Sequence, residues 1–154
     1  MRTVLLCLIL IASLFSNAQT SESDKRKKQF NLSSASIAVE GYDVLSYYTA
    51  SPKKGSKSFS TTHNGITYYF TSQANLDLFK KSPQKFEPGY GGWCAYAMGN
   101  TGEKVEVDLE TYKIVDGKLY LFYNAYFNNT LPKWNKDESN LKLKADKNWI
   151  TIYK

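Results

Sequence analysis

Two Xaa-Gly dipeptides constrain the fold of this chain more than any other feature, because each predicts a tight turn between two strand-like runs. They are Asn64-Gly65 and Asp116-Gly117, and aromatic and β-branched residues flank both. Two-residue hairpin turns need positive φ at both central positions, which Asn, Asp and Gly tolerate best. The sequence therefore predicts two antiparallel β-hairpins.

The hairpin strands also predict a register. In the first hairpin we expect His63 opposite Ile66 and Phe59 opposite Phe70, so His63 lies on the apolar face at the turn end. In the second, the returning strand over residues 118–123 is apolar or aromatic on both faces. That pattern is typical of a strand covered on each side.

Helical patterns lie between and beyond the hairpins. Ser72 is a candidate N-cap of an amphipathic helix that ends before Pro83. The glycine-rich turn Gly91-Gly92 is expected to open a short helix that ends at Gly99.

In the C-terminal region, one helix is expected to end near Pro132 and another to begin after Asn135, with Glu138 completing a partial capping box. The core-facing stripe of that last helix is Leu141, Ala145 and Trp149. Hairpins interleaved with short helices and a C-terminal helix predict a small single domain of the α+β class.

The N-terminus predicts export. A positive charge at Arg2 precedes an apolar run over residues 4–12, and small residues precede Gln19. This layout is that of a secretory signal peptide over residues 1–18, and the run is shorter than the ~20 residues that span a bilayer. We therefore expect a secreted or periplasmic protein without a transmembrane segment.

Residues 19–36 are polar and rich in Ser and Lys, and we interpret them as a flexible linker before a domain over residues 37–154. The formal net charge of +6 is concentrated in this linker at residues 25–28. The remaining sequence is nearly neutral, so no nucleic-acid partner is expected.

Outside the signal peptide, Cys94, Met98 and His63 supply the only thiol, thioether and imidazole groups. A lone cysteine excludes an intramolecular disulfide and a four-ligand structural zinc site. Cys94 and Met98 lie one helical turn apart, and these three soft donors suit monovalent copper. The leading hypothesis is a soft-metal site at Cys94, with Met98 and His63 as further ligands.

Two other interpretations of Cys94 remain open. At the start of a helix the dipole favours a thiolate, so Cys94 could be the catalytic nucleophile of a thiol oxidoreductase. Alternatively, Cys94 is merely buried in the core of a non-catalytic interaction domain. The expected partner of the protein is a metal ion or a small solute, and the sequence indicates no particular protein partner. A cysteine hydrolase is disfavoured, because His63 precedes Cys94 and there is no second histidine.

Several segments resemble YHS domains, and the resemblance covers about residues 37–150. They are GYDVLSYY (41–48), NGITYYFTS (64–72), YGGWCAY (90–96) and IVDGKLYL (114–121). The Gly-Gly-aromatic-Cys-Ala motif resembles the exported branch of this family, whose members carry Cys or selenocysteine at the position of Cys94.

The resemblance implies a treble-clef-like core and a redox or heavy-metal role for Cys94. The cysteine that such domains often carry near their start is absent, with Asp43 nearby. Another position that often carries cysteine is occupied by Thr71.

Overall fold

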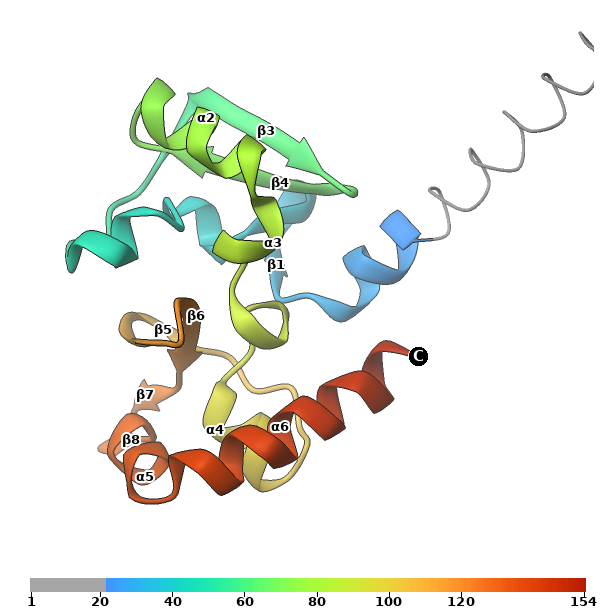
Figure 1. Cartoon of the computed structure of the whole chain (residues 1–154), viewed down its shortest axis with the longest axis vertical. Helices are drawn as coiled ribbons and strands as arrows, with labels where there is room; N and C mark the ends of the chain where they lie inside the picture. Colours follow the sequence, from blue (N-terminus) through green and yellow to red (C-terminus); the bar gives the residue numbers. More distant parts are fainter. Residues whose placement is uncertain (1–21) are drawn as a thin grey trace, which may run out of the picture.

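The computed structural model describes residues 22–154 (Figure 1). Its largest sheet is formed by residues in the first half of the sequence. Its strand order is β1-β2-β4-β3, with a parallel pairing of β2 and β4 between two antiparallel pairings. The strands are β1 (Leu32–Ser33), β2 (Ile37–Ala38), β3 (Ser56–His63) and β4 (Ile66–Phe70).

Two further antiparallel pairs follow in the sequence. They are β5 (Asp108–Val115) with β6 (Lys118–Phe122), and β7 (Asn124–Ala125) with β8 (Asn128–Asn129). The two hairpins expected from the Xaa-Gly turns are therefore confirmed, and together with the helices they confirm the α+β class.

The helical elements are of two kinds, α-helices and short 3-10 turns. The α-helices are residues 22–29, α2 (Gln73–Lys81), α3 (Pro83–Phe86), α4 (Ala95–Asn100), α5 (Leu131–Lys136) and α6 (Glu138–Tyr153). The 3-10 turns are η1 (Ser34–Ser36), η2 (Val39–Gly41), η3 (Ser46–Thr49) and η4 (Gly89–Gly92).

The expected register of the first hairpin is correct near its turn and wrong further along. His63 pairs with Ile66, but Phe70 pairs with Ser56 instead of Phe59. A register shift between Ser56 and Ser60 separates the two regions. The extra residues of such a bulge bend the strand, and an alternating pattern does not reveal them.

Strand β6 divides the core in two. Leu119 and Leu121 pack with sheet residues and α2, whereas Tyr120 and Phe122 pack with α4, α5 and α6. Successive strand side chains point to opposite faces, so one strand serves both clusters. The expectation that this strand is covered on each side is confirmed.

The helix boundaries agree with the sequence in part. The Ser72 hydroxyl accepts a hydrogen bond from the Asn75 amide at 3.2 Å, which confirms the expected N-cap of α2. The expectation that a helix ends near Pro132 is wrong, because Pro132 lies in the first turn of α5, where its missing N–H has no partner to lose. Helix α6 begins at Glu138 after Asp137, not near Asn135, and buries the expected Leu141 and Ala145.

The expected flexible linker is wrong over its described part. Residues 22–29 form a helix, and Arg26, within the run of positive charges, is only 7% exposed. Ser23 lies against Gly65 at the β3–β4 turn, where a Cβ would overlap its hydroxyl. Lys25 lies near the ring of Tyr153, so this helix contacts both halves of the molecule (Figure 1). The expected signal peptide lies outside the described residues.

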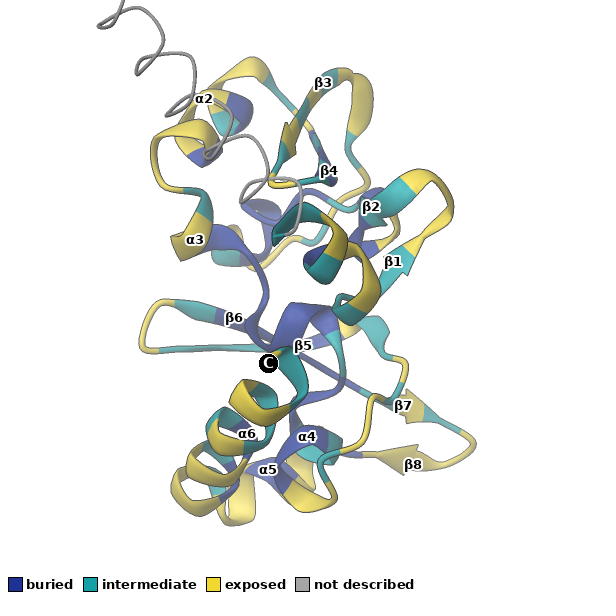
Figure 2. Cartoon of the chain, turned by 90° about the vertical axis from the view of Figure 1, so that its right-hand side faces the viewer, coloured by how far each residue is buried: buried dark blue, intermediate teal, exposed yellow. Residues whose placement is uncertain are grey.

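Within residues 22–154, no helix combines the length and the apolar character needed to cross a membrane. Figure 2 shows buried residues along β6 and in η4, in contrast to the mostly exposed β7–β8 hairpin.

Candidate functional site

Cys94 is the N-cap residue of α4 and has no exposed surface, at 0%. Its amide donates to the carbonyl of Val105 at 2.9 Å, and its backbone bridges to Leu121 of β6. The cysteine therefore lies where α4, β6 and the loop before β5 meet.

Two hydrogen bonds hold the Cys94 side chain in place. The Thr130 hydroxyl donates its single hydrogen to the carbonyl of Tyr123 at 2.9 Å. The Cys94 thiol must then be the donor in its 3.5 Å contact with the Thr130 oxygen, while its sulfur accepts from the Tyr123 amide at 3.3 Å. The Cys94 side chain is thus hydrogen-bonded on both sides within the protein, as is usual for a structural side chain.

Cys94 also lies in the wall of a cavity of about 410 Å³, which we call the Cys94 cavity. Its other walls include Tyr96, Asn100, Glu103 and Asn128. Met98 follows one turn later in α4, is fully buried, and belongs to the cluster around Trp134 and Phe122.

His63 lies in the other half of the molecule from Cys94. Its ring centroid is 6.3 Å from that of Phe79 in α2, at the turn end of the β3–β4 hairpin. Among residues 22–154, no three His, Cys, Asp or Glu side chains gather where they could hold a metal ion. The ring of His63 thus packs against Phe79, whereas Cys94 precedes α4 and Met98 lies within it, and the copper site stays a prediction.

The Gly91-Gly92 segment does not form an open cradle for a bound anion. Gly91 has φ +61, and a Cβ there would lie 2.9 Å from Trp149 and 3.0 Å from the ring of Phe30. Its carbonyl accepts from the Asn31 amide at 2.9 Å. Gly91 instead allows two aromatic rings to approach the backbone closely.

Those rings line a second cavity, of about 420 Å³, between residues 22–30, η4 and α6. We call it the Arg26 cavity. Its aromatic walls are Phe30, Tyr90, Tyr120, Trp149 and Tyr153. Its charged lining residues are Glu22, Arg26, Glu87, Lys118 and Asp146.

Arg26 and Glu87 form a buried ion pair in this lining. The Tyr68 hydroxyl also donates to Glu87, at 2.7 Å, and burial together with the Glu87 charge raises the pKa of Tyr68 well above its usual value. Tyr68 thus stays protonated as a donor. The Arg26 guanidinium stacks on Phe30, 4.4 Å from the ring centroid, and its Nε has no acceptor among the described residues.

Phe30 packs edge to face against two other rings of the aromatic wall. Phe30 lies 5.9 Å from Trp149 and 6.5 Å from Tyr153, measured between ring centroids. Tyr90 donates to Asp146 at 2.9 Å, and burial raises the pKa of Tyr90 above its ordinary value. The Arg26 guanidinium lies over Phe30 and the Lys25 ammonium lies over Tyr153, while Tyr90, Tyr120 and Trp149 also line the cavity.

The Arg26 cavity was not expected from the sequence. In the sequence, Arg26 is one of four consecutive basic residues, so nothing sets it apart from its neighbours. The spacing of Glu22, Arg26 and Phe30 does, however, place them on one helical face. The stripe of Leu141, Ala145 and Trp149 continues to Tyr153. These two stripes, which end in aromatic residues, are the signals that point to a shared wall.

No family model matches the chain, and no similar curated protein or solved structure was found. The fold thus defines the class, a small α+β domain, and the YHS resemblance stays a prediction from the sequence.

Proposed function

We propose that this protein is a non-catalytic, YHS-like binding domain that holds a small organic solute in the Arg26 cavity, with Cys94 as a structural thiol. The observation that carries the proposal is a hollow of about 420 Å³ with five aromatic walls and a buried ion pair in its lining. Pockets for small ligands typically have such a volume and combine aromatic walls with polar groups that fix the orientation of the ligand.

The position of the cavity supports the same function. Its walls come from the N-terminal helix, η4 and α6, which are far apart in sequence. Gly89 and Gly91 are both placed where a side chain would overlap an aromatic wall residue. The backbone is thus shaped to hold these rings around the hollow.

Binding is tested with a library of small organic fragments, followed by NMR shifts of the protein amides. We expect shifts around η4 and the end of α6, and about tenfold weaker binding in Trp149→Leu, because an aromatic wall is lost. Tyr96→Leu, a matched change in the Cys94 cavity, should leave the affinity unchanged. Fragments that bind Trp149→Leu as well as the wild type, or that shift no amide of the Arg26 cavity, would overturn the proposal.

Soft-metal binding at Cys94 is a second candidate. It is favoured by the wall position of Cys94 in a cavity and by Met98 one helical turn away, where the Met98 amide donates to the Cys94 carbonyl at 3.0 Å. Thiolate and thioether sulfurs are donors that monovalent copper prefers. An ion that took the Cys94 sulfur would displace its hydrogen bonds to Thr130 and Tyr123.

Copper titration of the wild type and Cys94→Ser under reducing conditions tests this second candidate. Loss of stoichiometric monovalent copper binding in Cys94→Ser would support it. Equal binding by both proteins would overturn it. His63→Gln is a suitable control, because His63 contacts Phe79 in the other half of the molecule and should not alter binding.

A further inference from the structure

The negative charges of the Arg26 cavity already have partners. Glu87 is paired with Arg26 and accepts from Tyr68. Asp146 is paired with Lys142 at 2.8 Å, and Glu22 accepts from the Tyr153 hydroxyl. Each carboxylate that lines the cavity therefore already has a donor partner within the protein.

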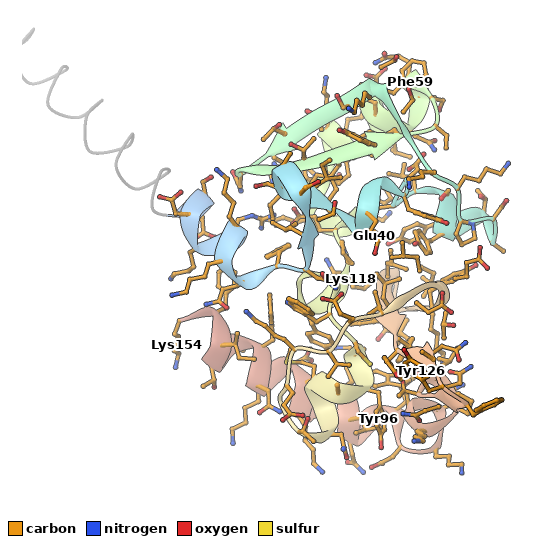
Figure 3. The ribbon with its side chains drawn as sticks, turned by 180° about the vertical axis from the view of Figure 1, so that it is seen from behind. Glu40, Phe59, Tyr96, Lys118, Tyr126 and Lys154 are labelled. Carbon is orange, nitrogen blue, oxygen red and sulfur yellow. The ribbon has the colours of Figure 1, made fainter. Side chains whose placement is uncertain are left out.

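Lys118 differs from these residues. It begins β6, immediately after the Asp116-Gly117 turn, and Figure 3 shows it between the two halves of the molecule. Its ammonium donates to the Gln84 carbonyl at 2.7 Å and takes part in no ion pair among the described residues. An ammonium has three donors, so two remain for a ligand.

The burial and charged neighbours of Lys118 favour a ligand of negative charge. Burial lowers the pKa of Lys118, and the nearby Glu87 charge offsets this only in part. A bound anion would compensate the desolvated ammonium. Because three carboxylates also line the cavity, a singly charged anion is favoured over a doubly charged one.

We propose that the ligand of the Arg26 cavity is a small monocarboxylic acid with an apolar body, whose carboxylate binds Lys118 while its body contacts the aromatic walls. This inference rests on the proposed function. The two groups of the ligand match the two kinds of lining, one unpaired cation and a set of rings.

Matched acid–amide pairs, such as phenylacetate and phenylacetamide, test the inference at pH 7. In the wild type we expect each acid to bind about tenfold or more tightly than its amide, since a charge-assisted hydrogen bond is lost in the amide. Lys118→Met keeps the apolar stem and should abolish this preference without weakening the amides. Lys118→Arg should retain the preference, and Lys85→Met, at an exposed lysine of another cavity, should leave both affinities unchanged.

The outcomes separate the two proposals. Pairs that bind in the cavity with equal affinity for acid and amide overturn the monocarboxylate inference and leave the proposed function standing. An acid preference that survives in a folded Lys118→Met overturns the role of Lys118. If no member of any pair shifts the cavity amides, both proposals fail. The acid-to-amide ratio of the wild type alone decides the ligand class, should Lys118→Met not fold.

Discussion

At the scale of single residues, two fully buried polar groups organise their surroundings. Asp43 and Cys94 are both 0% exposed, and each satisfies its hydrogen-bonding capacity within the protein. Buried polar groups with complete sets of partners fix local geometry, because any replacement leaves a donor or acceptor unpaired. Each residue therefore allows a prediction about substitution.

Cys94 should resist alkylation in the folded protein. Its side chain is 0% exposed and is hydrogen-bonded to the Thr130 hydroxyl and the Tyr123 amide. An alkylating reagent can therefore reach the sulfur only when the structure opens locally. In a Cys7→Ser background, we expect labelling at a small fraction of the rate of an exposed thiol, and full labelling in denaturant. Rapid labelling of the native protein would instead favour the thiol oxidoreductase, with Cys94 as the nucleophile.

Asp43→Asn should destabilise the fold by about 2–4 kcal/mol. One carboxylate oxygen of Asp43 accepts from the Leu45 amide at 2.9 Å, and the other accepts from the Thr71 amide, the Thr71 hydroxyl and the Asn75 side chain. An amide NH2 would face one of these sets of donors. Denaturant unfolding measures the loss, and Asp77→Asn, at an exposed carboxylate in α2, should change stability by less than about 0.5 kcal/mol.

At the scale of elements, turns formed by local signals were predictable, and elements that depend on distant contacts were not. The Asn64-Gly65 and Asp116-Gly117 hairpins follow from two residues each. Arg26 in the helix over residues 22–29 pairs with Glu87, 61 residues away, and a charge run alone does not indicate such a contact. The β7–β8 hairpin was missed because its turn, Tyr126-Phe127, contains no residue that favours positive φ.

That turn is strained and should become more stable as Asn-Gly. Tyr126 and Phe127 have φ of 50° and 61°, and they are 92% and 112% exposed, so they contribute no packing. Figure 3 shows Tyr126 at the edge of the molecule. Because the left-handed region costs most residues about 1–2 kcal/mol, we expect Tyr126→Asn with Phe127→Gly to stabilise the fold by about that amount.

Thermal unfolding measures this gain. The matched control is Asp116→Asn, which also gives an Asn-Gly turn but starts from one that already suits positive φ, with Asp116 at 50° and Gly117 at 73°. It should change stability little. A lower stability of the Tyr126→Asn, Phe127→Gly variant would show that the aromatic tip makes contacts in solution, as in self-association.

At the scale of the whole molecule, the N-terminal helix and β6 join the two halves of the core. Helix 22–29 contacts the β3–β4 turn through Ser23 and the end of α6 through Lys25. The α+β class and the short helix that follows Cys94 were predictable from local sequence signals. The Arg26 cavity was not, since its walls meet only when segments distant in sequence pack together.

The Arg26–Glu87 pair tests whether this helix is integral to the fold. Arg26→Met should cost about 3–5 kcal/mol, because it leaves the Glu87 carboxylate buried without its cation. Adding Glu87→Gln removes that charge but keeps an acceptor for Tyr68, so the double variant should be more stable than Arg26→Met alone.

Lys27→Met, one residue along on the exposed face of the helix, is the matched control and should stay within about 0.5 kcal/mol of the wild type. Equal stability of Arg26→Met and Lys27→Met would mean that residues 22–29 are a tether in solution. The Arg26 cavity would then lack the wall on which ligand binding depends.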